Sequence, residues 1–192
     1  MSPHADAVRT LTAWSPGEPS QESLRHAFLA YLAARPDACA RSCEPGHLTA
    51  SMVLLDATGQ HVLLTLHPRV GRWLQLGGHC ESGDGSLALA ALREGVEESG
   101  IDGITVDPVP LHLAVHPITC SLGIPTRHFD VRYLGVAPPG ARPVISGESV
   151  DLAWWPVDAL PPDSHTADDV GVQVALALRH LAPPLKSALG EL

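Results

Sequence analysis

"LREGVEESGI", residues Leu92–Ile101, places Glu94, Glu97 and Glu98 at the helical spacings i, i+3 and i+4. At about 100° per residue, these side chains fall on one side of a helix, where like charges repel one another. Two interpretations of this crowding are open. The glutamates form a solvated surface face, or a cation lies among them.

The sequence around the glutamates favours the cation. A solvated acidic face usually alternates glutamate with lysine or arginine, but Arg93 is the only basic residue between positions 86 and 99. We expect the opposite side of this helix, with Leu89, Leu92 and Val96, to face the core. Upstream, "LQLGGHCESGDG" predicts a Gly-Gly turn that brings bare backbone close to the helix. Carboxylates and a main-chain carbonyl are ligands that suit Mg²⁺ or Mn²⁺.

Apolar periodicity predicts an α+β domain in which strands surround this central helix. Ser20 is the expected N-cap of a first helix that Pro36 ends, Gly59 marks a hairpin, and Gly100 is the expected C-cap of the central helix. Asp168 or Asp169 is expected to cap the last helix. The expected helices are 20–35, 86–99 and 169–181, and the expected strands are 47–56, 61–68, 71–80, 111–120, 127–138 and 151–157. These strands form a mixed sheet.

Composition excludes several classes of protein. The 192 residues carry a formal net charge of −9, which argues against a general nucleic-acid binder with a basic patch. No stretch approaches the roughly 20 apolar residues that span a bilayer, so no membrane partner is expected. Neither a signal peptide nor a disulfide framework is indicated by the first residues or by the 4 cysteines. The expected location is the cytoplasm.

The segment "GGHCESGDGSLALAALREGVEESGI" resembles the Nudix box, G-x5-E-x7-R-E-U-x-E-E-x-G-U, where U is a bulky aliphatic residue. Gly78 matches the first glycine, so the box spans residues 78–101. The second half of the box is matched in register by Arg93, Glu94, Glu97, Glu98, Gly100 and Ile101. Two positions depart from the pattern. Asp84 replaces the first glutamate and is separated from Arg93 by eight residues rather than seven, with Glu81 as an alternative, and Gly95 occupies an aliphatic position.

The resemblance implies a Nudix fold, an α/β/α sandwich with flanking N- and C-terminal helices. It implies hydrolysis of a diphosphate linkage in a nucleoside diphosphate derivative, with Mg²⁺ or Mn²⁺ as cofactor and water attacking phosphorus. Metal ligands are expected at Glu94, Glu97, Glu98 and Gly78. Catalytic roles are expected for Glu97, Glu94, Arg93 and Glu148, with Arg93 orienting a glutamate. The residue that deprotonates water stays open, and Glu148 is one candidate for it.

Two other functions are compatible with the resemblance. One is an isomerase of the isopentenyl diphosphate type, which uses His, Cys and Glu around metals. The other is a non-catalytic Nudix-fold ligand sensor. We expect an N-terminal helical extension over residues 1–43 and the Nudix domain over 44–192. The resemblance also makes a homodimer a candidate assembly.

Histidines add a second pattern of polar residues. Pairing of the strands on either side of Gly123 would bring His116 and His128 together on one face, which Asp130 shares. With His79 beside the glycines, they would bind phosphate oxygens or an extra metal, or they are ordinary half-buried strand histidines. Arg72 completes the predicted substrate-binding set.

Two further patterns carry weaker predictions. Cys39, Cys43 and His47 have a spacing that resembles a zinc site, but no fourth ligand stands at a standard spacing. Trp73, Trp154 and Trp155 would stack on a base or pack in the core.

Overall fold

The computed structural model describes residues 2–119, 123–147, 149–162, 166–167 and 169–181. The described helices are α1 (Pro3–Ala13), α2 (Pro19–Ala34), α3 (Leu87–Ser99) and α4 (Val170–Leu181). The described strands are β1 (His47–Leu55), β2 (His61–Leu66), β3 (Trp73–Leu74), β4 (Leu76–His79), β5 (Thr105–Val106), β6 (His112–Thr119), β7 (Pro125–Val136) and β8 (Asp151–Pro156). The predicted strand 71–80 is two short strands, and β5 was not predicted.

Strand β1 is the centre of one mixed sheet. It pairs in parallel with β7 along its whole length, from His47 opposite His128 to Leu55 opposite Val136. On its other side, β1 pairs antiparallel first with β4 and then with β2. The outer strands β3, β8, β6 and β5 join this core in antiparallel pairs. The predicted hairpin is confirmed, with Gly59 in its turn at φ 68°.

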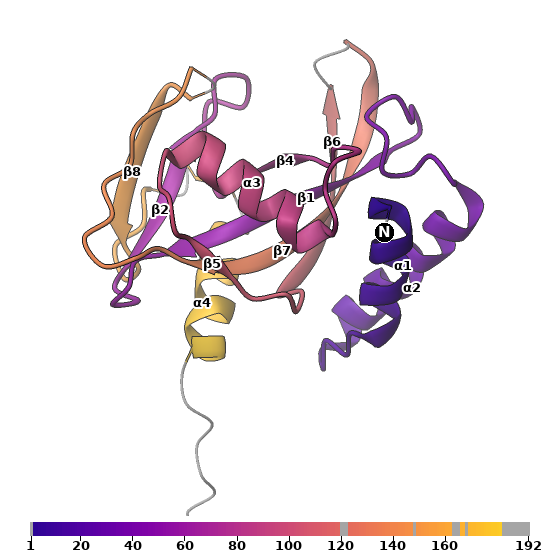
Figure 1. Ribbon diagram of the computed structural model, residues 1–192, viewed down its shortest axis with the longest axis horizontal. Coiled ribbons are helices and arrows are strands. Elements are labelled where there is room, and N and C mark those ends of the chain that lie inside the picture. Colours follow the sequence, from indigo (N-terminus) through magenta and orange to yellow (C-terminus); the bar gives the residue numbers. More distant parts are fainter. Residues whose placement is uncertain (1, 120–122, 148, 163–165, 168, 182–192) are drawn as a thin grey trace, which may run out of the picture.

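The two faces of the sheet carry different cores. Leu48, Ala50, Met52 and Leu54 of β1 belong to a cluster with α1, α2 and α3, while Val53 and Leu55 belong to another with α4. Successive side chains of a strand point to opposite faces, which explains this separation. Figure 1 shows α3 across one face and α4 on the other. The predicted α/β/α sandwich with a mixed sheet is therefore confirmed.

The N-terminal helices pack on the same core as α3. Helix α1, which was not predicted, starts with the Ser2 side chain capping Ala5 N, and Pro3 stands at its first position. Buried Asp6 accepts a hydrogen bond from Leu87 N at 2.8 Å and so holds the first turn of α3. The division of the chain at residues 43 and 44 stays a prediction.

Helix α2 differs from its prediction at one end. Ser20 lies inside the helix and is not its N-cap, because Pro19 fits the first helical turn and Glu18 becomes the N-cap. The helix ends before Pro36, as predicted. None of the helices in the described ranges is both long and apolar enough to cross a bilayer.

Candidate active site

Helix α3 has the predicted ends and a different buried face. Ser86 caps its start by accepting from Leu89 N, and Gly100 ends it at φ 64°. Leu89 is 49% exposed, so the prediction that it faces the core is wrong, although Leu92 and Val96 are half-buried against that core. The face turned to the sheet is made of small residues and one carboxylate: Ala88, Ala91, Gly95 and Glu98 are buried. Small side chains let the helix axis lie close to the strands.

Gly95 has a packing reason for replacing an aliphatic residue. A Cβ there would lie 3.2 Å from Met52 Sδ, and a Cβ at Gly135 of β7 would lie 2.2 Å from the same sulfur. Met52 is fully buried between these two glycines. The cost of glycine in a helix, about 1 kcal/mol against alanine, is therefore offset by packing on Met52.

The two glycines upstream of α3 lie in strand β4 and not in a turn. Gly77 and Gly78 pair with Ser51 and Ala50 of β1. A Cβ at Gly78 would lie 2.6 Å from Oε1 of Glu94, and the N–H of Gly77 donates to Oε2 of Glu98 at 3.1 Å. The missing side chains leave room for two carboxylates of α3 to reach the backbone of β4.

Arg93 connects the residues at the start of the site through hydrogen bonds. Its guanidinium donates to both oxygens of Asp84 at 3.1 and 3.2 Å, and to the carbonyl of His79 at 2.8 Å. It also donates to Glu94 at 3.0 Å and to Glu97 at 2.9 Å. The hydrogen bonds to Asp84 raise the pKa of Arg93 above its usual value. A guanidinium with so many partners orients carboxylates and has little left for a phosphate.

Asp84, the residue that departs from the box, is the buried partner of Arg93. It also accepts a hydrogen bond from Glu81 N at 2.7 Å. The extra residue between Asp84 and Arg93 therefore still brings the two together. Glu81 is exposed and its carboxylate lies 4.0 Å from Arg93. Within the described residues, neither carboxylate makes a hydrogen bond to Gly77 or Gly78.

The carboxylate group of α3, Glu94, Glu97 and Glu98, fits a hard divalent cation. Glu94 and Glu98 bring their carboxylate oxygens close to the backbone of Gly78 and Gly77. The Glu97 side chain is 58% exposed and lies beside them. Carboxylate and backbone oxygens are the donors that Mg²⁺ and Mn²⁺ prefer. The predicted roles of these residues and of Gly78 stay predictions.

Three histidines meet on the opposite face of the sheet. The predicted pairing of His116 with His128 is confirmed by the register of β6 and β7. His47, at the start of β1, and His79 of β4 join His128, with ring centroids 5.0 to 5.1 Å apart. We call His47, His79 and His128 the histidine cluster. His116 is a neighbour, its ring centroid 5.5 Å from that of His128.

The histidine cluster is held neutral by burial. Desolvation lowers the pKa of all three imidazoles, to about 4 for His79 and about 3 for His128. Beside the cluster, Asp130 accepts hydrogen bonds from Thr49 and Ser51 and pairs with Arg132 at 2.8 Å. Burial alone would raise the pKa of Asp130, but the charge of Arg132 keeps it below its usual value.

His47 was missed as a member of this cluster. The sequence offered it only within the Cys39, Cys43 and His47 spacing, and these side chains do not come together. The Cys43 thiol contacts Tyr31 Oη at 3.3 Å, and His47 meets only the carbonyl of Cys43. The missing signal was the parallel pairing of β1 with β7, which no local spacing reveals.

Other predicted residues lie elsewhere. Glu148 and Asp168 are outside the described residues, and the Asp169 carboxylate pairs with Arg132 at 2.5 Å. Arg72 precedes β3, and its carbonyl accepts from His67 N at 3.1 Å. Its role in substrate binding stays a prediction.

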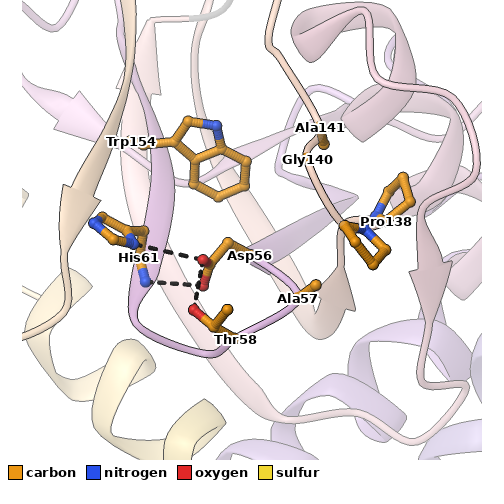
Figure 2. Close-up of a pocket in the computed structure, with 9 residues that line it drawn as sticks. Asp56, Ala57, Thr58, His61, Pro138, Gly140, Ala141 and Trp154 are labelled. Carbon is orange, nitrogen blue, oxygen red and sulfur yellow. Dashed lines mark hydrogen bonds and ion pairs between the residues drawn. The ribbon is translucent and has the colours of Figure 1, made fainter.

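A surface pocket lies away from both groups. Figure 2 shows it between Trp154 and Pro138, where the Asp56 carboxylate accepts hydrogen bonds from Thr58 and His61. None of the three glutamates or the cluster histidines lines it. Trp154 is half-buried against the core, and Trp73 packs edge-on against Trp155 at 5.4 Å. The tryptophans thus follow the core interpretation.

Comparison with known proteins agrees with this architecture. The NUDIX domain family model matches residues 45–173. A NUDIX-family hydrolase from Clostridium perfringens has a TM-score of 0.54 and 24% identity, covering 71% of this chain and 98% of that one. A Caenorhabditis elegans Ap4A hydrolase has a TM-score of 0.52 and 19% identity, and the match covers 70% of this chain and 96% of that one. The NUDIX domain of Shewanella oneidensis NrtR, complexed with ADP ribose, has a TM-score of 0.52 and 23% identity, and the match covers 80% of this chain and 98% of that one. Among curated proteins, none matches.

Proposed function

The chain belongs to the Nudix family, and from that premise we propose that it hydrolyses a diphosphate linkage in a nucleoside diphosphate derivative with the help of a divalent cation. The observation that carries the proposal is the meeting of Glu94 and Glu98 with the side-chain-free backbone of Gly78 and Gly77. These oxygens suit Mg²⁺ or Mn²⁺.

Each residue of the site has a stated role in this proposal. Glu94 and Glu98, with Glu97 beside them, hold the cation together with a carbonyl of the Gly77–Gly78 segment. Arg93 positions Glu94 and Glu97 through its two hydrogen bonds and is itself fixed by Asp84. A bound divalent cation would neutralise charge on the phosphoryl oxygens and orient water.

The reaction is a displacement at phosphorus. A water oxygen forms a bond to one phosphorus, the bond between that same phosphorus and the bridging oxygen breaks, and the other phosphate ester leaves with the bridging oxygen. The water proton passes to a carboxylate. Glu97 is one candidate for that base, because its side chain is 58% exposed and shares Arg93 as a hydrogen-bond donor with Glu94. Glu148 is the alternative candidate.

Release of phosphate or nucleoside monophosphate from a substrate panel tests the proposal. The panel contains nucleoside triphosphates, sugar nucleotides, ADP-ribose and Ap4A, the last two because solved relatives are named with them. Each is assayed with Mg²⁺ and with Mn²⁺. Glu97→Gln and Glu98→Gln are compared with Glu22→Gln, whose parent carboxylate pairs with Arg25 on α2.

We expect metal-dependent release that collapses in Glu97→Gln and Glu98→Gln and survives in Glu22→Gln. Equal release by all four proteins would contradict the proposed site. Absence of turnover, with ligands still raising the Tm, would instead establish a binding module. Isopentenyl diphosphate belongs in the panel, because its isomerisation without hydrolysis would replace the proposal by the isomerase.

A further inference from the structure

We propose that His47, His79 and His128 bind one divalent transition-metal ion of the zinc type, at a site separate from the carboxylate group of α3. Each of these histidines offers a ring nitrogen, and the three nitrogens lie within 4.8 Å of one another. Among the described residues, this is the only set of three His, Cys, Asp or Glu side chains that comes so close. The inference does not rest on the proposed hydrolysis.

The backbone already fixes where the three rings stand. His47, His79 and His128 belong to the neighbouring strands β1, β4 and β7, and both strand pairs are hydrogen-bonded along several residues. His79 is opposite Thr49, two residues along β1 from His47, so all three side chains share one face. Sites built on strands hold their geometry better than sites built on loops.

The tautomer of His47 suits a metal ligand. Its Nδ1 lies 3.2 Å from the carbonyl oxygen of Cys43, and a carbonyl can only accept a hydrogen bond. Nδ1 therefore carries the proton, and the lone pair of neutral His47 is on Nε2. Metal-binding histidines commonly donate their other N–H to such a carbonyl, which orients the ring.

The Nε2 lone pair of His47 points into the cluster. Without a metal, it accepts a hydrogen bond from Nε2 of His79 at 3.1 Å, so His79 must move its proton to Nδ1 when an ion binds. Two ligand nitrogens about 2.0–2.1 Å from a tetrahedral zinc ion are about 3.3 Å apart. This pair is therefore close to the spacing for a shared ion, and the ligand nitrogen of His128 lies within 4.8 Å of both.

His128 supplies a second, independent observation. Its Nε2 is buried and has no hydrogen-bond partner among the described residues. A buried polar atom without a partner costs free energy and calls for an explanation such as an ion. Its neighbours on the sheet do not supply one, because the Asp130 carboxylate is occupied by Thr49, Ser51 and Arg132.

Three neutral imidazoles select a borderline cation rather than Mg²⁺ or Ca²⁺. A fourth coordination position is left to His116, to water or to an anion. A small cavity borders His47 and is lined also by Arg41, Cys43, Glu44 and Thr126. The positive charge of Arg41 opposes a cation there, but Arg41 is exposed and its effect is screened.

Cobalt binding to the whole chain tests the proposal. The protein is stripped with EDTA and titrated with Co²⁺ in excess Mg²⁺, which occupies the carboxylates. We expect one Co²⁺ per chain, with the visible absorption of nitrogen coordination, displaced by Zn²⁺. Zn²⁺ at a hundredfold excess over its Kd should raise the Tm by about 5–10 °C.

Variants identify the ligands. We expect the Co²⁺ band to disappear in His128→Gln and the affinity to fall at least tenfold in His79→Gln. The matched control His61→Gln removes an imidazole from the start of β2, and its Co²⁺ band and Co²⁺ affinity should both match those of the wild type. Circular dichroism of the metal-free variants separates lost ligands from lost folding.

X-ray absorption of the wild-type zinc complex needs no variant and counts the imidazole ligands. Three or more imidazoles support the proposal. Oxygen-only coordination, no stoichiometric metal, or Co²⁺ binding unchanged in both His128→Gln and His79→Gln would overturn it.

Discussion

The carboxylate group of α3 and the histidine cluster are separated by the thickness of strand β4. Gly78 is opposite Ala50 and faces α3, whereas the next residue, His79, is opposite Thr49 and faces the other way. One side gathers charged oxygens around Arg93, and the other gathers neutral nitrogens away from water. The alternation of one strand thus keeps a hard-metal ligand set apart from a borderline one.

The largest expected effect concerns the support of the histidine side. Asp130→Asn removes the buried carboxylate that lies 2.8 Å from the fully buried Arg132 and leaves it only the partly exposed Asp169 as an ion-pair partner. We expect a loss of about 3–5 kcal/mol in the free energy of unfolding, measured by urea titration. Asp37→Asn, which breaks the exposed pair with Arg35, should cost no more than about 1 kcal/mol. Equal losses of unfolding free energy in both variants would show that the buried ion pair contributes no more to stability than the exposed one.

The next prediction asks whether the two sides are independent. Glu98→Gln should lower Mg²⁺-dependent kcat/KM by about a hundredfold or more, because it removes the charge of a proposed cation ligand beside Gly77. Its Co²⁺ affinity should stay within about twofold of wild type. Calorimetric titration in excess Mg²⁺ measures this affinity. A parallel loss of activity and Co²⁺ binding would show that the two sides share one metal centre.

A smaller effect is expected from the glycines of β4. Gly78→Ala pushes only on the end of the Glu94 side chain, at 2.6 Å, so we expect about tenfold lower kcat with little change in Tm. Gly77→Ala meets Ser51 Cα at 2.5 Å and has φ 150°, so the fold itself should lose stability. Assays and thermal melts of both variants check this. Lost stability in Gly78→Ala, with only lost activity in Gly77→Ala, would show that Gly78 does not face Glu94.

The smallest effect is expected at Gly95. Alanine there gains about 1 kcal/mol of helix propensity but meets Met52 Sδ at 3.2 Å. We expect the two contributions to cancel to within about 1 kcal/mol in urea unfolding. Gly135→Ala, with its Cβ at 2.2 Å from the same sulfur, is the comparison and should be clearly destabilising. A strongly destabilised Gly95→Ala would mean that Met52 cannot move.

The carboxylate side could be predicted from sequence because one helix contains it. The spacing of Glu94, Glu97 and Glu98, with the Gly100 C-cap, needs only helical geometry. The prediction that failed there concerned which face of α3 is buried. Leu89 was expected in the core, but contact with β1 demanded the small residues Ala91 and Gly95 instead. The partner of a helix decides its buried face as much as its own apolar residues do.

The histidine side was only half predictable. His116 and His128 are joined by a hairpin, which sequence symmetry reveals. His47 reaches His128 through parallel pairing with β7, and no turn residue signals such a pairing. Asp84 is an intermediate case. Its pairing with Arg93 follows the order of the box, but the one-residue shift could be judged only from the distances.

The parallel pairing of β1 with β7 also has a consequence for the order of folding. Thr49 and Asp130 are 81 positions apart in the sequence, yet their side chains are hydrogen-bonded. Closing such a long loop is slow, because its entropy is lost before any contact forms. During synthesis, α3 can form early, whereas β1 must wait for β7 to leave the ribosome. The histidine cluster is therefore among the last features to assemble on the nascent chain.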